Sequence, residues 1–513
     1  MNFRFHRRLL AACALLSFLN LAAAVEPAQA ELVVDTQAAG PRIDPDIYGQ
    51  FAEQLGAGIY GGLWVGPESP IPNTRGWRND VVQALRHLQV PVVRWPGGCF
   101  ADDYDWRDGI GDPARRPVRL NRWWGGVPET NRVGTHEFMD LAEQLGAEVV
   151  IAGNMGSMSP REMSQWLEYM TATGPSALTD ERRRNGRDKP WKVKYIGVGN
   201  ESWGCGGNMR PEYQADLHNR YATFLNGGVQ RIASGDGQGN DHLIDVLMER
   251  SIGQMDALTL HYYTIPGDWK KKGSATGFDA AEWAHTLKVA RGIETRIAAI
   301  EAIMDKRDPK RRVGLFIDEW GTWYDTEPGA NPGFLYQQNT LRDALVAALT
   351  LDVFHRHTDR VRMTSIAQMV NVLQSMVLAD GARMVLTPTY HVFDMYRPFK
   401  GATPLSSRLS TSNWHSGADE LPSVDASVAR TADGATVLAI VNLDPERPAH
   451  VRTNLQGEFR GSILTAAKMD AHNTFDRPHA IEPAPFAARG GAGGLVLDLP
   501  PGTVLVVSAP ARH

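Results

Sequence analysis

The sequence is poor in cysteine, in net charge and in long apolar runs. Its 513 residues include three cysteines and carry a formal net charge of only −5, which gives no basis for binding nucleic acid or an anionic membrane. The one long apolar run is short for a membrane span, and no second run follows. No internal repeat is present. With 43% hydrophobic and 22% charged residues, the composition is that of a soluble globular protein of two or three domains.

The N-terminus has the pattern of an export signal. Arg4, Arg7 and Arg8 precede a nearly continuous apolar run over residues 9–25, and Ala28-Gln29-Ala30 supplies a small-residue cleavage pattern. This predicts a signal peptide over residues 1–30, a periplasmic or secreted protein, and no membrane association after cleavage. Retention as an uncleaved anchor is the alternative interpretation.

Two cysteines remain after such a cleavage. Cys13 lies in the predicted signal, whereas Cys99 and Cys205 both lie close to motifs that carry the predicted chemistry. An even pair in an oxidising compartment favours a disulfide. Two free, half-buried thiols are the other interpretation, and the sequence leaves both open.

Strands and helices alternate through most of the chain. Apolar, strand-like runs at 90–95, 147–152, 193–198, 255–260 and 313–317 are interleaved with helical periodicity at 136–146, 161–171, 211–224 and 280–304. This alternation indicates parallel β/α units, and their number favours a closed (β/α)8 TIM barrel over residues 47–395. After residue 395, short apolar runs between turn residues predict a β-sandwich over 396–513. An early strand within 31–46 is predicted to pair with it.

Two glutamates end strand-like runs, each beside a tryptophan. Glu201 closes the run from Tyr195 to Asn200, and Glu319 follows the run from Gly314 to Asp318. Two carboxylates at the C-terminal ends of barrel strands divide acid/base work from nucleophilic work, as in glycoside hydrolases. Two separate carboxylates, each merely solvated at a strand end, are the weaker interpretation.

Other polar side chains follow the same strand ends. Asn200 is placed to bond a sugar 2-hydroxyl, Tyr263 to hold the carboxylate of the nucleophile, and His261 to tune its charge. Arg94 would be costly to bury unpaired, so Glu319 is its predicted partner. The alternatives are a turn-capping asparagine and a packed core histidine and tyrosine.

No metal or organic cofactor is expected. The run Asp102-Asp103-Tyr104-Asp105 is rich in carboxylates, but its spacing fits no standard metal site. The predicted chemistry requires only the two glutamates.

The chain resembles glycoside hydrolase family 51, the α-L-arabinofuranosidases of clan A. The segments that carry the resemblance span essentially the whole predicted mature chain: 48–56, 59–62, 93–100, 104–111, 129–131, 134–138, 199–204 and 318–321. The resemblance implies a (β/α)8 barrel with a C-terminal, jelly-roll-like β-sandwich. It further implies a hydrolase that releases terminal α-L-arabinofuranosyl residues, with retention, from plant polysaccharides or oligosaccharides such as arabinan or arabinoxylan. Members are often homo-oligomers.

The resemblance also assigns roles. Glu201 matches the acid/base and Glu319 the nucleophile, and Cys99 stands where many members have asparagine. At Cys99 a hydrogen bond to the sugar is either lost or made by a thiol, unless a Cys99–Cys205 bridge braces the wall instead. Gln368 matches a further sugar contact, although Gln374 fits nearly as well. The remaining matches to the arabinose site are Glu53, Arg94, Trp124, Asn200, His261, Tyr263 and Trp323.

Three other functions compete with this one. An endo-β-glucanase or xylan-directed hydrolase on the same scaffold would use the same two glutamates, and the loops at 64–77 and 267–277 would decide between a pocket and a groove. A catalytically silent carbohydrate-binding protein is disfavoured because both carboxylates are present. A structural domain is disfavoured because polar residues converge on the strand ends.

Overall fold

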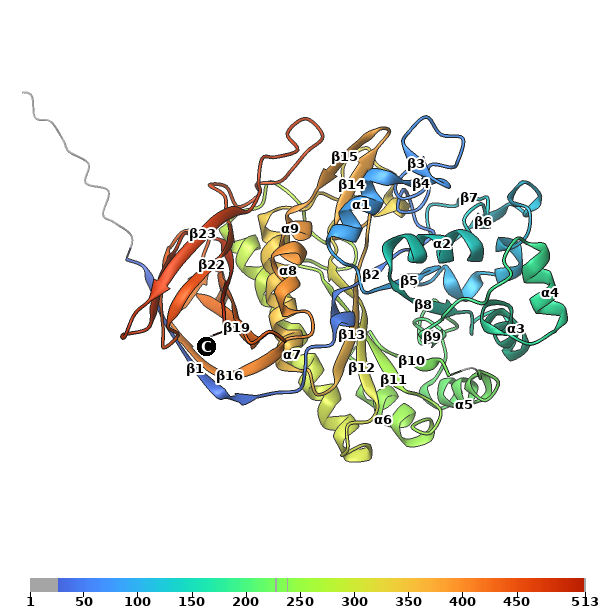
Figure 1. The fold of residues 1–513 in the computed structure, drawn as a ribbon, viewed down its shortest axis with the longest axis horizontal. Helices are drawn as coiled ribbons and strands as arrows, with labels where there is room; N and C mark the ends of the chain where they lie inside the picture. The colour runs from blue at the N-terminus through green and yellow to red at the C-terminus, as the bar shows by residue number, and fades with distance from the viewer. Residues whose placement is uncertain (1–25, 227, 238, 512–513) are drawn as a thin grey trace, which may run out of the picture.

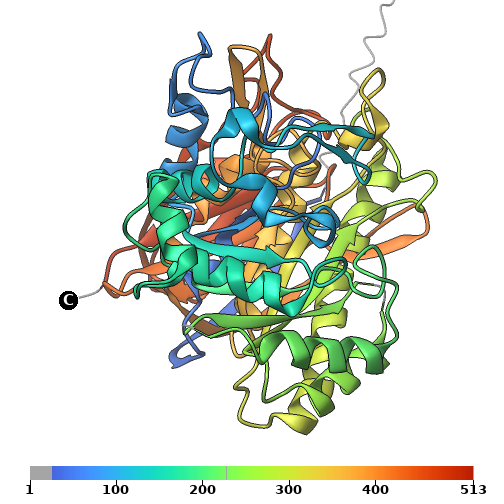
Figure 2. The same cartoon turned by 90° about the vertical axis from the view of Figure 1, so that its right-hand side faces the viewer.

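The computed structural model describes residues 26–226, 228–237 and 239–511. It contains an eight-stranded closed barrel and a nine-stranded sheet, which lie side by side in Figure 1. The view in Figure 2 looks onto the barrel, with the strands of the C-terminal sheet behind it. The predicted fold class, a TIM barrel with a C-terminal β-sandwich, is confirmed.

The barrel strands are all parallel, and each is bonded to two neighbours. Around the ring they are β10 (Gln230–Asp236), β11 (Ala257–Thr264), β12 (Gly314–Thr322), β13 (Val361–Ile366), β2 (Gly49–Phe51), β5 (Val92–Trp95), β8 (Glu148–Gly153) and β9 (Tyr195–Val198). Seven of the eight strands each contribute one side chain to an interior layer: Val92, Val150, Tyr195, Ile232, Ala257, Phe316 and Met363. The barrel is therefore filled by side chains below its C-terminal rim.

Helices cover the outside of the barrel. They are α1 (Asn79–His87), α2 (Thr135–Leu145), α3 (Pro160–Thr171), α4 (Ala177–Arg184), α5 (Pro211–Ala222), α6 (Asp241–Arg250), α7 (Ala280–Arg307), α8 (Leu341–Arg356) and α9 (Pro388–Met395). Short 3-10 turns lie at Pro45–Tyr48, Ala101–Asp103, Trp106–Gly109, Pro113–Arg115, Pro332–Phe334 and Arg397–Phe399. In the part of the chain that the structure describes, no helix combines the length and apolar character needed to cross a bilayer.

The loops above the barrel carry small two-stranded ribbons, and one more ribbon lies beside the large sheet. They pair β3 (Asn73–Thr74) with β4 (Trp77–Arg78), β6 (Arg119–Asn121) with β7 (Val127–Glu129), β14 (Val377–Asp380) with β15 (Arg383–Leu386), and β17 (Asn413–Ser416) with β18 (Asp419–Pro422).

The C-terminal sheet draws one of its inner strands from the beginning of the chain. Its order is β23 (Ala484–Gly490), β22 (Gly457–Leu464), β25 (Thr503–Ala509), β20 (Thr436–Asn442), β19 (Val424–Arg430), β16 (Thr403–Thr411), β1 (Ala28–Ala39), β21 (Ala449–Thr453) and β24 (Leu495–Leu499). β1 pairs antiparallel with β16 and parallel with β21. Ala28, Ala30, Leu32 and Val34 alternate inward into the core.

β1 begins before the predicted boundary at Glu31. Ala28 pairs with Ala449 and Ala30 with Val451, so the predicted cleavage pattern is part of the strand. Residues 1–25 of the predicted signal lie outside the described residues.

Polar contacts fix the barrel against the sandwich. Trp283 of α7 donates its indole N–H to the carbonyl of Leu443 at 2.9 Å, and His355 of α8 contacts Ser427 of β19 at 2.8 Å. One hydrophobic cluster includes barrel residues and strands β20 and β25 of the sandwich. The barrel, whose rim carries the loops, and the sandwich therefore share one continuous hydrophobic core.

Candidate functional site

A cavity of about 460 Å³ opens at the C-terminal ends of the barrel strands. This is the end at which enzymes of this fold place their chemistry. The structure brings most of the predicted site residues together in its lining: Glu53, Cys99, Trp124, Asn200, Glu201, His261, Tyr263, Glu319, Trp323 and Gln368. The two other predicted residues are each bonded to a member of this lining, Arg94 to Glu319 and Cys205 to Cys99.

Glu201 occupies a tight turn just beyond β9. Its backbone is in the left-handed region, with φ of 41°, a conformation that is unusual for a residue other than glycine and is often found at functional sites. Its side chain is 20% exposed, compared with 7% for Glu319. Glu201 is thus the carboxyl of the pair with better access to solvent protons.

Glu319 lies within β12 and is held from three directions. Its Oε1 accepts a hydrogen bond from Nη1 of Arg94 at 2.9 Å, and its Oε2 accepts one from the hydroxyl of Tyr263 at 2.8 Å. Nδ1 of His261 lies 3.4 Å from the same Oε2. These donors stabilise a charged carboxylate in a buried position.

The two glutamates approach each other closely. A carboxylate oxygen of each, together with a ring nitrogen of His261, all lie within 4.8 Å of one another. A gap of this size is smaller than the one that an inverting enzyme needs to hold a water molecule beside the bound sugar.

Arg94 joins the two halves of the site. Its Nη2 donates to Oδ1 of Asn200 at 2.6 Å, and its Nε pairs with Asp318 at 3.2 Å. The guanidinium also lies over the ring of Phe51 at 4.3 Å. Counting Glu319, its predicted partner, the buried guanidinium has three acceptors: the carboxylates of Glu319 and Asp318 and the amide oxygen of Asn200.

His261 carries a positive charge between three carboxylates. Burial lowers the pKa of its imidazole, but the charges of Glu319 and Asp318 outweigh this and raise it well above the ordinary value. Nδ1 faces Glu201 at 2.9 Å, and Nε2 faces Asp318 at 3.2 Å. For Asp318, burial raises the pKa, and Arg94 and His261 more than compensate, so its carboxyl titrates below its usual range.

Glu53 forms the opposite wall. Its Oε1 accepts from the backbone N–H of Gly98 at 2.9 Å and from the indole N–H of Trp124 at 2.8 Å, and its Oε2 accepts from Gln368 at 3.1 Å. Burial and the nearby charge of Glu319 raise its pKa to about 7. Gln374, by contrast, is fully buried and bonded to the backbone of Thr322, so Gln368 is the glutamine at the cavity.

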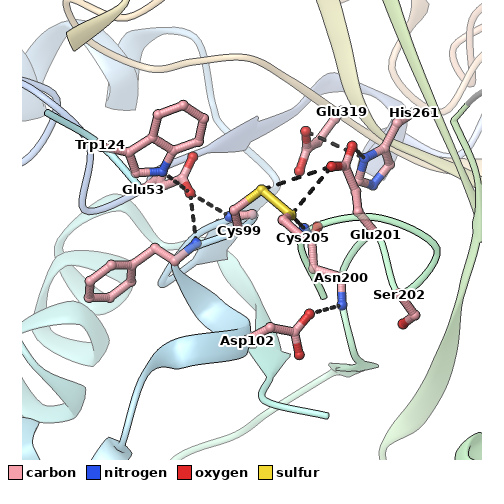
Figure 3. The surroundings of a disulfide bond; sticks show 12 residues. Glu53, Cys99, Asp102, Trp124, Asn200, Glu201, Ser202, Cys205, His261 and Glu319 are labelled. Atoms are coloured by element: carbon pink, nitrogen blue, oxygen red, sulfur yellow. Dashed lines mark hydrogen bonds and ion pairs between the residues drawn. A yellow bond between two sulfur atoms is a disulfide. The ribbon is translucent and has the colours of Figure 1, made fainter. Parts of the chain in front are cut away.

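Cys99 and Cys205 form a disulfide, with an Sγ–Sγ distance of 2.07 Å (Figure 3). It links the loop after β5 to the loop after β9. The sulfurs of Cys205 and Cys99 lie 3.5 and 3.9 Å from Oε2 of Glu201. Neither sulfur carries a hydrogen in this state, so these contacts are packing contacts that limit where the Glu201 carboxylate can move.

Two aspartates of the site were missed by the sequence analysis. Asp318 was passed over because Glu319 follows it directly. Asp102 lies in the run considered for a metal, but its carboxylate instead accepts the backbone N–H groups of Met155 and Gly156. It also accepts the backbone N–H of Asn200 (Figure 3). It therefore anchors the turn that presents Glu201, and burial raises its pKa to about 7.

Among the described residues, two groups of side chains have the spacing of metal ligands: one consists of Cys99, Glu201 and Cys205, and the other of Glu201, His261 and Glu319. The histidine of the second group is charged, and its carboxylates already face His261 and Arg94. These two side chains therefore provide the positive charge that a metal ion would provide. The two cysteine sulfurs near Glu201 are bonded to each other and offer no thiolate.

The chain is similar in sequence to known α-L-arabinofuranosidases. A sequence profile described as "Alpha-L-arabinofuranosidase 1 domain" matches residues 84–276, and one described as "Alpha-L-arabinofuranosidase C-terminal domain" matches residues 318–502. An intracellular exo-α-L-arabinofuranosidase of Bacteroides ovatus is 49% identical over 454 residues, covering 86% of this chain and 88% of that protein.

Solved structures agree with the sequence matches. The GH51 arabinofuranosidase from Xanthomonas axonopodis pv. citri superimposes with a TM-score of 0.93 and 49% identity, covering 94% of this chain and 100% of that one. The thermostable GH51 α-L-arabinofuranosidase from Thermotoga petrophila has a TM-score of 0.84 and 27% identity over 94% of this chain and 100% of its own.

The prediction of an exported, periplasmic or secreted protein is wrong. The Bacteroides relative, which matches most of this chain, is named an intracellular enzyme. The small residues read as a cleavage pattern pair instead with β21 as part of β1. By fold, by sequence profiles over residues 84–276 and 318–502 and by relatives that match most of its length, the chain belongs to glycoside hydrolase family 51, the α-L-arabinofuranosidases.

Proposed function

We propose that this protein is an exo-acting, retaining α-L-arabinofuranosidase that removes terminal arabinofuranosyl residues from plant polysaccharides or oligosaccharides. Glu319 is the proposed nucleophile and Glu201 the proposed acid/base. The observation that carries the proposal is the close approach of their carboxylate oxygens, within 4.8 Å. Retaining enzymes hold their carboxyl groups about 5 Å apart, whereas inverting enzymes need a clearly larger gap.

In the first step, a carboxylate oxygen of Glu319 attacks the anomeric carbon. The bond to the leaving oxygen breaks, and protonated Glu201 gives that oxygen its proton. Arg94 and Tyr263 support this assignment because both donate to the Glu319 carboxylate and favour its ionised form.

In the second step, Glu201 removes a proton from water, whose oxygen attacks the anomeric carbon and displaces Glu319. Arabinose leaves with its configuration retained. The fixed positive charge of His261, next to both glutamates, stabilises negative charge on whichever of the two is ionised. Glu53, Gln368 and Trp124 form the proposed wall around the arabinose ring.

Hydrolysis of 4-nitrophenyl glycosides tests the proposal. We expect the wild-type protein to cleave the α-L-arabinofuranoside but not the β-D-glucoside or β-D-xyloside. Glu319→Ala should be inactive. Glu201→Ala should lose about 10²- to 10⁴-fold on natural glycosides, and less in the first step with a nitrophenolate leaving group, which needs no proton.

Glu212→Ala, at an accessible glutamate of α5 outside the cavity, serves as the control and should behave as wild type. Nuclear magnetic resonance of the first product formed gives the stereochemistry. Release of the inverted sugar, or cleavage of the glucoside or xyloside in place of the arabinoside, would contradict the proposal.

A further inference from the structure

The disulfide lies against one oxygen of Glu201, the proposed acid/base. Sγ of Cys205 and Sγ of Cys99 lie 3.5 and 3.9 Å from Oε2 of Glu201. The other oxygen, Oε1, is the one that Nδ1 of His261 faces, at 2.9 Å. In Figure 3 the two sulfurs and His261 accordingly lie on opposite sides of the carboxylate. Oε2 is therefore the oxygen that is directed toward the two sulfurs.

Reduction of the disulfide changes the chemistry that the two sulfurs offer. A dithiol supplies two electrons and two protons and itself becomes a cyclic disulfide, while the Cys99–Cys205 bond becomes two thiols. Cys99 lines the cavity, and both cysteines and Glu201 are half-buried, so a small dithiol and an aqueous ion have access to them. Thiolates are among the ligands that zinc prefers, and carboxylates also bind it.

The spacing of the three side chains matches that of a zinc site. In a tetrahedral site with Zn–S bonds of about 2.3 Å and a Zn–O bond of about 2.1 Å, each sulfur lies about 3.6 Å from the oxygen. The distances from Oε2 of Glu201 to the two sulfurs, 3.5 and 3.9 Å, are close to this value. The two sulfurs of such a site are about 3.8 Å apart. Because the Cα atoms of Cys99 and Cys205 are 5.5 Å apart, rotation of the side chains alone reaches that separation.

The two loops remain joined when the sulfur–sulfur bond is broken. Asp102, which belongs to the loop of Cys99, accepts the backbone N–H of Asn200 in the other loop at 2.7 Å. Within that second loop, the N–H of Gly206 donates to the carbonyl of Glu201 at 3.1 Å and closes the turn. Neither bond involves sulfur, so reduction leaves both in place and the two thiols stay beside the carboxylate.

The charges around Glu201 suit a divalent cation at this position. Binding of Zn²⁺ to two thiols displaces their protons, so the ion with two thiolates and one carboxylate carries one net negative charge. His261, which the neighbouring carboxylates keep protonated, balances this charge from the far side of Glu201. A hydrogen bond to the second oxygen of a ligating carboxylate also fixes its orientation.

We propose that the reduced protein binds one zinc ion through Cys99, Cys205 and Glu201, and that the disulfide abolishes this site. The metal site goes beyond the proposed function, whereas its effect on turnover rests on that function. Zinc on Oε2 prevents Glu201 from donating a proton in the first step and from accepting one in the second. The disulfide thus protects the acid/base from cations that bind thiolates.

Zinc binding by the reduced and the oxidised protein tests the site directly. The protein is reduced with dithiothreitol and then separated from it under nitrogen, because this dithiol itself binds zinc. Competition with a chromophoric chelator should give one zinc ion per reduced chain, bound at least about 100-fold more tightly than by the oxidised protein. Co²⁺ in place of zinc should show cobalt–thiolate charge-transfer absorption with the reduced protein alone.

Three variants assign the ligands. Cys205→Ser and Glu201→Gln should each weaken zinc binding by the reduced protein at least about tenfold, because each removes one ligand. Cys13→Ser is the matched control. It removes the third cysteine of the chain, which lies outside the described residues, and should bind zinc as the wild type does.

Three results would overturn the proposal. The first is equal zinc affinity of the reduced and the oxidised wild type, and the second is an unchanged affinity in reduced Cys205→Ser. The third is loss of the near-ultraviolet circular dichroism of the folded protein on reduction, since the site requires Asp102 to hold the two loops together without the disulfide.

Hydrolysis of 4-nitrophenyl α-L-arabinofuranoside provides an independent measurement. Zinc at about ten times its Kd should lower the activity of the reduced wild type about tenfold, and removal of zinc with EDTA should restore it. The oxidised protein should keep its activity at the same zinc concentration. Full activity of the zinc-loaded, reduced protein would contradict Glu201 as a ligand. Inactivity of the oxidised protein without zinc would instead overturn the proposed function and leave the binding measurements unaffected.

Discussion

Nε2 of His261 lies 3.2 Å from Oδ1 of Asp318, so the residue just before the proposed nucleophile fixes the orientation of the imidazole. The other ring nitrogen then faces both glutamates. Because Asp318 is also paired with Arg94, the positions of both buried cations depend on this one carboxylate.

Replacing His261 with glutamine should shift the pH dependence of activity. The substitution removes the imidazole whose Nδ1 lies 2.9 Å from Glu201 and 3.4 Å from Glu319, and with it a positive charge next to both. We expect the profile of kcat/KM against pH to move toward higher pH, together with a lower maximum. A profile of unchanged position and reduced height would show that the histidine acts by packing alone.

Gly98 lies against both walls of the proposed arabinose site, and its lack of a side chain is predicted to matter. A Cβ there would lie 2.8 Å from Oε1 of Glu319 and 3.5 Å from Oε1 of Glu53. Gly98→Ala should therefore raise KM or lower kcat by at least about tenfold, since small displacements of catalytic groups are costly. Steady-state kinetics on the nitrophenyl arabinofuranoside measure this. Gly253→Ala, where a Cβ meets nothing within 4 Å, is the control and should behave as wild type.

The carboxyl of Glu53 should make stability depend on pH. Burial, with a smaller contribution from Glu319, raises its pKa in the folded protein from 4.5 to about 7, so the folded state binds this proton more tightly than the unfolded state does. Its contribution to the unfolding free energy is complete below about pH 4.5 and is lost as the pH rises through about 7.

Glu53→Gln should remove that dependence. Between pH 4.5 and 7.5 we expect the unfolding free energy of the wild type to fall by about 3 kcal/mol more than that of the variant, measured by urea denaturation. The comparison cancels other titrating groups, including Asp102, whose pKa burial also raises to about 7. Equal slopes for the two proteins would contradict the prediction.

The disulfide should contribute to stability as well as to the shape of the site. Cys99 and Cys205 are 106 residues apart, and closing a loop of this size restricts the unfolded chain. The double variant Cys99→Ser, Cys205→Ser should lose about 2–5 kcal/mol of unfolding free energy in urea denaturation. Dithiothreitol should lower the stability of the wild type and leave the double variant unaffected. A wild type that is indifferent to the reductant at full reduction would contradict this.

The sequence predicted the barrel from five strands that are continuous apolar runs, but three other strands lack that signal. β2 has only three residues and includes Gln50, β10 has only Ile232 and Ala233 as apolar members, and β13 interleaves polar residues. They are strands because the closed ring supplies partners on both sides, which is a property of the whole chain and not of the local sequence.

The grouping of side chains at the cavity was predictable where one residue carries the signal by its place at a strand end, as for Glu201 and Glu319, which both line it. It was not predictable where the function of a residue depends on a distant partner. Asp102 accepts the N–H of Asn200, and Asp236 pairs with Arg296, and nothing in the local sequence links these positions. The prediction of a cleavage site at the N-terminal alanines was wrong for another reason. Small alternating residues are typical both of a cleavage site and of a buried strand face.

The position of β1 between β16 and β21 has a consequence for how the protein is made. The ribosome delivers β1 first and its two neighbours only after the entire barrel has been translated. The sandwich cannot form until synthesis is nearly complete. β1 therefore remains without its neighbouring strands while the barrel folds. A ribosome that stalls before the last strands would release a chain with a finished barrel and an exposed apolar strand, which quality-control chaperones and proteases recognise as incomplete.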